Sequence, residues 1–248
     1  MLVAIMPFSV DAYLPAIPAM ADSLGADIHR IEQSLSTFMF GVAAGQLVGG
    51  SIADIKGRRV VALTGLVVYI ASVIGLVFIR SGDVLLLFGL VQAFVAGMTV
   101  VVVVAIVRDN YVGNKAAQMF ALIGIIMMGA PLVAPMLGAA LKALGGWRLI
   151  FGFLALYAAI VCGLLYRFLA KPVPTDAINR SIFRTVAARY RHVLSTRPAL
   201  GFLFFQAFSF SSMFVFLTES SFVYMNLYGL SAHAYAWVFG LSIMPFAT

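Results

Sequence analysis

The chain has 248 residues, of which 63% are hydrophobic and only 10% are charged. Because a soluble domain carries roughly 25% charged residues, this composition excludes a soluble globular fold and indicates a protein whose surface mostly faces lipid. The formal net charge of +7 would suggest a nucleic-acid partner in a soluble protein, and the single cysteine, Cys162, allows no disulfide framework.

Several stretches reach the roughly 20 apolar residues with which a helix crosses a membrane. The first covers residues 1–21 and is broken only by one acid. Six uncharged stretches follow, at residues 33–53, 60–79, 84–107, 116–141, 149–166 and 198–218. Residues 220–248 hold the end of the seventh helix, a turn near residues 226–231 and the start of an eighth. Since a lone strand would leave its backbone groups unpaired in lipid, we expect an all-α membrane protein with eight helices, the last unfinished.

The basic residues are unevenly divided between the loops. When the loops are assigned alternately to two sides, twelve of the 16 Lys and Arg residues fall on one side. The other side has only Arg30, Arg80, Lys142 and Arg148. The positive-inside rule places the side with twelve in the cytoplasm. This bias explains the net charge without a nucleic-acid partner.

Asp11 is the acid in the first apolar stretch. It lies about ten residues from the start, which at 1.5 Å per residue is roughly 15 Å and near the middle of the membrane. A carboxylate at that depth costs roughly 3 kcal/mol or more, so it should face a cavity or a polar partner. We interpret Asp11 as a group that takes up and releases a proton. The alternative is a residue near a helix end that is held by a hydrogen bond.

The second predicted helix has glycines at every fourth position, Gly41, Gly45 and Gly49. They lie on one face and allow another helix to approach closely. Gln46, on the same helix, either lines a cavity or forms a hydrogen bond to a neighbouring helix.

The turn between the second and third helices is short and basic. It contains Gly50, Asp54, Gly57, Arg58 and Arg59. Asp54 can cap the amides at a helix start, and Arg58 can hold a nearby carboxylate through charge-assisted hydrogen bonds. The alternative is a turn that only sets the orientation of the chain.

The fifth predicted helix contains Gly129, Pro131, Pro135 and Gly138. Prolines at positions i and i+4 free backbone carbonyls and bend a helix, and the small residues allow tight packing. The alternative is a plain proline kink without a further role.

The longest polar segment lies between the sixth and seventh helices. Apolar residues recur at helical spacing from Ile178 to Leu194, with arginines between them. This pattern predicts a basic amphipathic helix on the inner leaflet; a calmodulin-like or nucleic-acid target has a similar pattern and is the alternative. Further along, Glu219 lies about 21 residues after Pro198, or roughly 31 Å, at the outer membrane boundary. It is either an interfacial residue or a second acid for cationic substrates.

The basic turn resembles the loop signature of the major facilitator superfamily, in which a glycine is followed by an aspartate four positions on and then by Gly-Arg-Arg or Gly-Arg-Lys. Ile55 stands where a basic residue usually follows the aspartate, with Lys56 next to it. The resemblance implies that the cluster latches the cytoplasmic side shut. It also implies an ion pair between Arg58 and Asp109, which follows Arg108 at the end of the fourth helix.

Other segments resemble one branch of this superfamily, the Bcr/CflA-type multidrug efflux transporters. They are residues 11–18, 129–138, 147–151, 208–214 and 221–224, and the resemblance runs in order along the whole chain. The helix 5 segment is similar to the antiporter motif in its Ala-Pro-x-x-Ala-Pro variant.

The resemblance implies a fold of two six-helix halves. Residues 1–168 would form the complete N-terminal bundle, residues 169–197 a cytoplasmic linker, and residues 198–248 a truncated start of the second bundle. It further implies a protein of the bacterial inner (plasma) membrane that exports small amphipathic compounds in exchange for protons by alternating access. We expect a monomer when full length, whose partners are lipid, protons and a small-molecule substrate, with no nucleic acid, catalytic residue, metal or cofactor. Candidates for the substrate cavity are Tyr13, Gln46, Gln92 and Glu219.

One position departs from the antiporter pattern. Antiporters of this superfamily usually carry an arginine in the outer third of helix 4, and the spacing back from Arg108 places Gly89 there, with Gln92 one turn inward. The alternatives are therefore an uncoupled or differently coupled carrier of a small metabolite, or an inactive fragment. An intramembrane enzyme is disfavoured, because it needs a Ser–His pair or two facing aspartates and only Asp11 lies clearly at depth.

Overall fold

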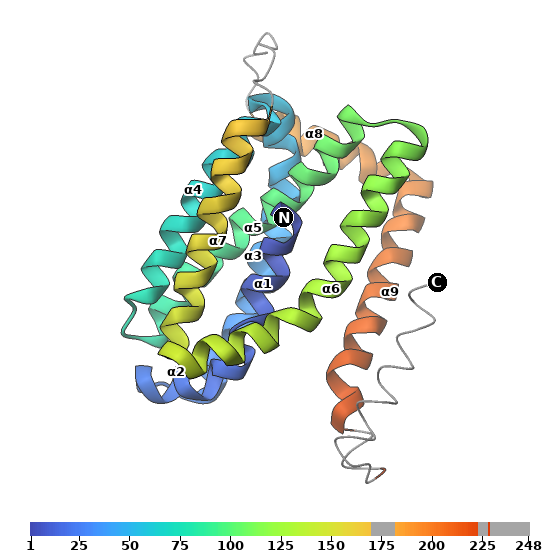
Figure 1. The fold of residues 1–248 in the computed structure, drawn as a ribbon. Helices are drawn as coiled ribbons and strands as arrows, with labels where there is room; N and C mark the ends of the chain where they lie inside the picture. The colour runs from blue at the N-terminus through green and yellow to red at the C-terminus, as the bar shows by residue number, and fades with distance from the viewer. Residues whose placement is uncertain (170–181, 223–227, 229–248) are drawn as a thin grey trace. The chain divides into compact units, whose positions relative to one another are not determined.

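The computed structural model describes residues 1–169, 182–222 and 228, and all regular structure in these residues is helical. The chain forms two compact units, Met1–Val186 and Ala187–Thr248. In the first unit six helical segments are long and apolar enough to cross a membrane. They are Leu2–Leu24 and the helices α3 (Ile28–Lys56), α4 (Arg58–Val77), α5 (Gly82–Asn110), α6 (Gly113–Gly145) and α7 (Trp147–Phe168), drawn in Figure 1. The predicted all-α membrane fold is confirmed.

Most of these helices are longer than the uncharged stretches that predicted them, because local caps determine where they begin and end. Asp27 caps α3, with its carboxylate accepting a hydrogen bond of 2.8 Å from the His29 amide. Ser81 caps α5 in the same way, through the Val84 amide. Gly57 and Gly146, with φ of 88° and 75°, each separate two helices in a conformation that favours glycine. The ends of the helices therefore extend beyond the apolar spans.

The first span is not the single helix that the sequence predicted. It consists of two short 3₁₀ segments and two short helices, η1 (Leu2–Ala4), α1 (Ile5–Asp11), η2 (Leu14–Ala16) and α2 (Ile17–Leu24). Pro15 has no backbone N–H, so it cannot donate the i to i−4 hydrogen bond that would continue the helix past Asp11. Asp11 is consequently the last residue of α1, about midway along the span.

Helices α3 and α5 pack most closely, and the glycine ridge of α3 forms the contact. A Cβ atom built on Gly45 would overlap the backbone carbonyl of Phe94, and one on Gly49 would lie 2.7 Å from the Met98 Cα. A Cβ atom built on Gly97 of α5 would likewise overlap the backbone carbonyl of Val42. The predicted role of the α3 glycines in close helix packing is confirmed.

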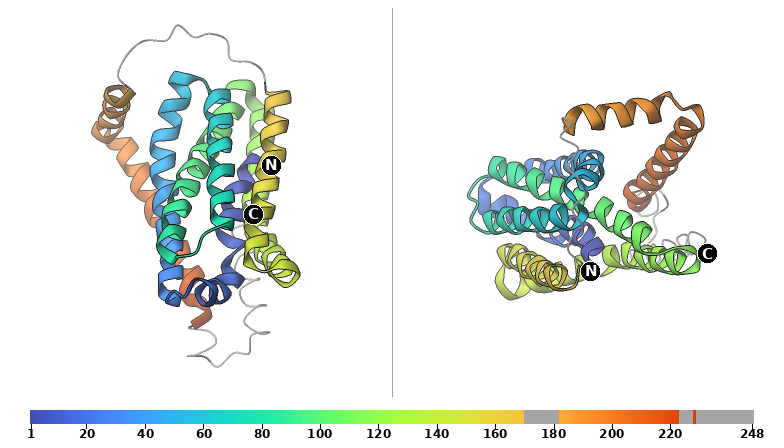
Figure 2. Two further views of the ribbon diagram at one scale, coloured as in Figure 1. Left: turned by 90° about the vertical axis from the view of Figure 1, so that its left-hand side faces the viewer. Right: turned by 90° about the horizontal axis from the view of Figure 1, so that it is seen from above.

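Helix α4 packs against both α5 and α7 (Figure 2). The largest buried cluster joins α4 and α7 to the first span, with Leu66, Tyr69, Ile150 and Phe151 fully or almost fully buried. Helix α6 is the least buried of the six spans. Pro131 and Pro135 lie inside it, and Figure 1 shows α6 changing direction along its length.

Two further helices are described outside these spans. Helix α8, Ile182–Ser195, falls within the predicted amphipathic segment, and α9, Arg197–Phe222, covers the predicted seventh span. Both are confirmed as helices. The linker residues 170–181 and the predicted eighth helix lie outside the described residues, as does the side chain of Glu219.

Candidate functional site

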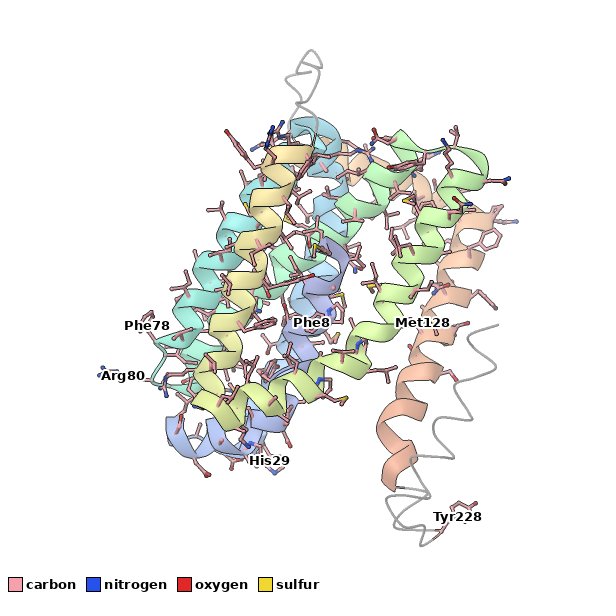
Figure 3. The ribbon with its side chains drawn as sticks, in the orientation of Figure 1. Phe8, His29, Phe78, Arg80, Met128 and Tyr228 are labelled. Atoms are coloured by element: carbon pink, nitrogen blue, oxygen red, sulfur yellow. The ribbon has the colours of Figure 1, made fainter. Side chains whose placement is uncertain are left out.

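The end of the first unit where α3 meets α4 and α5 meets α6 is called here the basic end. It carries Lys56, Arg58, Arg59, Arg108 and Lys115. The other end of the unit, called the opposite end, carries His29 and Arg80, which Figure 3 labels.

At the basic end, Arg58 joins the start of α4 to the end of α5. Its Nε lies 2.8 Å from Oδ2 of Asp109, and its Nη2 lies 3.5 Å from Oδ1 of Asp54. The Arg58 side chain is only 19% exposed, whereas the Asp54 and Asp109 side chains are 39% and 47% exposed. The predicted contact between Arg58 and Asp109 is confirmed, while its role as a latch stays a prediction.

Arg58 also has a nitrogen without a partner. Its Nη1 is buried and has no hydrogen-bond acceptor in the described part of the chain. Because a buried donor without an acceptor costs about 1–3 kcal/mol, this N–H group is a place where a further acceptor would stabilise the basic end.

The glycines of the turn have separate structural reasons. Gly57 has φ of 88° and ψ of 136° and lies between α3 and α4, where a side chain would be strained. A Cβ on Gly50 would lie 3.1 Å from Val101 Cγ1 of α5. These two positions bring Asp54 and Arg58 close to the end of α5.

Arg59 turns to a different helix from Arg58. Its Nη2 donates a hydrogen bond of 2.7 Å to the backbone carbonyl of Tyr166 in α7, and its guanidinium lies 5.5 Å from the centre of the Tyr166 ring. Arg108 is exposed. The basic turn thus binds α5 through one arginine and α7 through the next.

Asp11 is half-buried at the break between α1 and η2. No basic side chain forms an ion pair with it among the residues that the structure describes. A carboxylate without a cation in the middle of a membrane span is expensive to keep charged. The role of Asp11 in proton exchange stays a prediction.

Helix α6 packs directly on the helical break next to Asp11. A Cβ on Gly138 would overlap the backbone carbonyl of Ala12, and Lys142 Nζ donates a hydrogen bond of 3.0 Å to the carbonyl of Pro15. Gly129, in contrast, has open space beside it. Of the predicted helix 5 motif, the Gly138 end contacts the segment that follows the acid.

The substrate-cavity candidates lie in different environments. Gln92 is only 2% exposed and Tyr13 is buried within the first unit, and their predicted place at a cavity between two six-helix halves stays a prediction. Each side chain has a polar partner: the Tyr13 hydroxyl lies 3.0 Å from Ser34 Oγ, and Gln92 Nε2 donates to the Tyr69 hydroxyl at 3.3 Å. Gln46 is exposed on α3.

The Gln92 contact belongs to a buried chain of hydrogen bonds that the sequence did not predict. Ser9 Oγ donates to the carbonyl of Ile5 at 2.6 Å and lies 2.5 Å from the Tyr69 hydroxyl, which accepts from Gln92. These hydrogen bonds link α1, α4 and α5, and Ser9 lies two residues before Asp11. No sequence spacing connects Ser9 and Tyr69 with Gln92, so only the fold could identify them as a group.

The structure places Gly89 beside empty space. A Cβ on this residue would meet no atom within 4 Å. The position that the resemblance assigns to an arginine could therefore accept a side chain, but in this chain it has none.

At the opposite end, ion pairs and caps hold the helices together. Arg30 Nε donates a 3.0 Å hydrogen bond to Asp83 and so joins α3 to α5. Arg148 donates to the carbonyls of Val77 and Ile79 and caps the end of α4. Within the described residues no group of three or more His, Cys, Asp or Glu side chains is arranged to hold a metal ion.

Comparison with known proteins agrees with this architecture. The sequence profile of the Major Facilitator Superfamily matches residues 1–248. The chain is 29% identical over 240 residues to a bicyclomycin resistance protein homolog of Haemophilus influenzae, covering 96% of this chain and 60% of that protein. It is 30% identical over 234 residues to a chloramphenicol resistance protein of Pseudomonas aeruginosa, covering 93% and 54%. It is 27% identical over 241 residues to the multidrug resistance protein MdtL of Citrobacter koseri, covering 97% and 61%.

The chain thus spans somewhat more than half the length of these relatives. The family profile covers every residue, and the six spans of the first unit, the basic turn between the second and third of them and the bent fifth span follow the resemblance found in the sequence. The chain is a multi-pass membrane protein and belongs to the major facilitator superfamily.

Proposed function

We propose that the full-length protein exports small amphipathic compounds across the bacterial inner membrane in exchange for protons. Three of its relatives carry names that refer to bicyclomycin, chloramphenicol and multidrug resistance. Membership of the superfamily supports a transporter over the intramembrane enzyme. Alternating access would open a cavity between the two halves, of which this chain contains the first.

The observation that carries the proposal is the position of Asp11. This half-buried carboxylate ends α1 in the middle of a membrane span and has no cationic partner among the described residues. In the proposed cycle Asp11 binds a proton when it faces outward and releases it when the substrate enters from the cytoplasm. A single carboxylate that both steps use would couple the two movements.

The basic end would form the cytoplasmic latch. Arg58 bridges α4 and α5 through Asp109 and keeps one buried N–H group without an acceptor in the described part of the chain. An acceptor from the second half of the transporter would complete this site when the cytoplasmic side closes. Twelve of 16 basic residues support placing this end, and the linker at residues 169–197, in the cytoplasm.

A second candidate is a carrier without proton coupling. Gly89 favours it, because glycine stands where the antiporter pattern has an arginine, and this position therefore carries no charge. In such a carrier Asp11 would hold the substrate or the helix break, and transport would follow the substrate gradient alone.

Drug susceptibility tests the export activity. The full-length protein is expressed in a strain that lacks its main efflux pumps, and growth is measured with chloramphenicol, bicyclomycin and a panel of amphipathic cations. We expect raised resistance to at least one compound for the wild type and loss of that resistance for Asp11→Asn. Asp22→Asn, which changes an exposed aspartate of α2, is the matched control and should keep the resistance.

Equal amounts of the three proteins in the membrane must be verified by immunoblotting. Resistance to none of the compounds in the wild type would contradict a drug exporter. Resistance that survives in Asp11→Asn would contradict the role of Asp11 while leaving export standing.

A further inference from the structure

An apolar groove runs between α4 and α7 on the surface of the first unit. Its volume is about 790 Å³, and it is lined from α4 by Thr64, Val67 and Val68 and from α7 by Cys162, Gly163 and Tyr166, among others. Val67 and Val68 are 59% and 42% exposed. In a membrane protein such a surface contacts lipid, so the groove is open to acyl chains.

The groove offers almost no polar partner to a small drug-like molecule. Thr64 already donates its hydroxyl hydrogen to the carbonyl of Val60 at 2.8 Å. Tyr166 lies in the last turn of α7, and tyrosine is enriched at membrane interfaces. A ligand that fills the groove must therefore be apolar along its length, while any polar part lies at the basic end.

Arg59 stands at that end of the groove. It precedes the lining residue Leu63 by about one helical turn on α4, and its guanidinium contacts both the backbone and the ring of Tyr166. Within the described residues Arg59 has no carboxylate partner, whereas the neighbouring Arg58 has two. Only one of its N–H groups is bonded in the described part of the chain, and a guanidinium has five such donors.

We propose that this groove binds one anionic phospholipid, with an acyl chain along α4 and α7 and the phosphate on Arg59. Arginine recognises phosphate through paired, charge-assisted hydrogen bonds. Arg167, the exposed residue that follows Tyr166, adds a second positive charge at this end of α7 and favours a headgroup with net negative charge. The cytoplasmic side proposed for this end is the one to which basic residues of membrane proteins attract such lipids.

Photo-crosslinking tests the site directly. The full-length protein is placed in nanodiscs of equal parts phosphatidylglycerol and phosphatidylcholine, one of which carries a diazirine in its acyl chain. Mass spectrometry then locates the adducts. We expect phosphatidylglycerol adducts on α4 and α7 to exceed phosphatidylcholine adducts severalfold in the wild type. Arg59→Gln should bring the two lipids to parity, and Lys115→Gln, an exposed basic residue of α6 at the same end, should keep the preference.

Equal labelling by the two lipids in the wild type would overturn the proposal, as would a preference that survives in Arg59→Gln. A second measurement uses Cys162, which lines the groove, in a full-length protein in which any other cysteine is replaced by serine. Alkylation of Cys162 by N-ethylmaleimide should be slower in phosphatidylglycerol nanodiscs than in phosphatidylcholine nanodiscs. Equal rates would contradict an anionic lipid in the groove.

Discussion

Arg58 and Asp109 form the contact through which the basic turn holds α5. The Asp109 side chain is 47% exposed, so solvent weakens its attraction to Arg58. Arg58 is mostly buried, and one of its N–H groups has no acceptor in the described residues. The pair is therefore a modest source of stability, and its larger importance would be to orient Arg58 towards a further acceptor.

A double-mutant cycle of Arg58→Gln and Asp109→Asn measures the pair. We expect each single variant to lower the free energy of unfolding in detergent by about 1 kcal/mol or less. The double variant should lose less than the sum of the two, because the second change removes a group that has already lost its partner. Strictly additive losses would indicate that the two side chains do not interact in solution.

Tyr69 is the centre of the buried hydrogen-bond chain that joins α1, α4 and α5. Tyr69→Phe should lower stability by about 1–3 kcal/mol, since it leaves the buried Ser9 and Gln92 side chains without this partner. The same change at the exposed Tyr111, near the end of α5, is the control and should have little effect. Thermal unfolding of the two variants in one detergent gives the comparison, and equal shifts would contradict a stabilising role for the buried chain.

At the scale of helices, α3 and α5 form a rigid pair, and the broken first span lies against α6. The pair depends on small residues that bring two backbones into contact. The broken span depends on prolines, which release backbone groups next to Asp11. In the proposed transporter, this arrangement would let Asp11 move at the break while the closely packed pair of α3 and α5 stays fixed.

Two glycine substitutions separate packing from helix propensity. Gly45→Ala would place a methyl group against the Phe94 carbonyl, and we expect it to cost about 1–3 kcal/mol of stability. Gly89→Ala, on the helix that Gly45 contacts, has open space and should be neutral or slightly stabilising. If thermal unfolding gave the two variants the same stability, the close approach of α3 and α5 would be wrong.

At the scale of the whole molecule, the distribution of charge predicts which way the chain crosses the membrane. Lys115→Cys and Arg80→Cys, each in a background in which Cys162 and any other cysteine are replaced by serine, report on the basic end and the opposite end. We expect a membrane-impermeant maleimide to label Arg80→Cys in intact cells and to label Lys115→Cys only after permeabilisation. The reverse pattern would invert the proposed topology.

Much of this architecture was predictable from the sequence, because the bilayer imposes a simple rule of length and polarity on each span. The contact between Arg58 and Asp109 could be inferred as well, since the turn and the end of α5 carry a recognisable pattern. The helix ends could not, because caps such as Asp27 extend helices beyond the apolar stretch. Nor could the buried environment of Gln92 or the turn of Arg59 towards Tyr166, which depend on how the helices are rotated against one another.

Proton flux in proteoliposomes distinguishes an exporter in which Asp11 couples proton movement to export from a carrier without proton coupling. The full-length wild type and Asp11→Asn are reconstituted at equal density with a pH-sensitive dye inside, and chloramphenicol or whichever compound shows resistance in cells is added. We expect substrate-dependent proton movement in the wild type that falls to the level of empty liposomes in Asp11→Asn. Equal proton movement in both proteins would contradict the coupling role of Asp11.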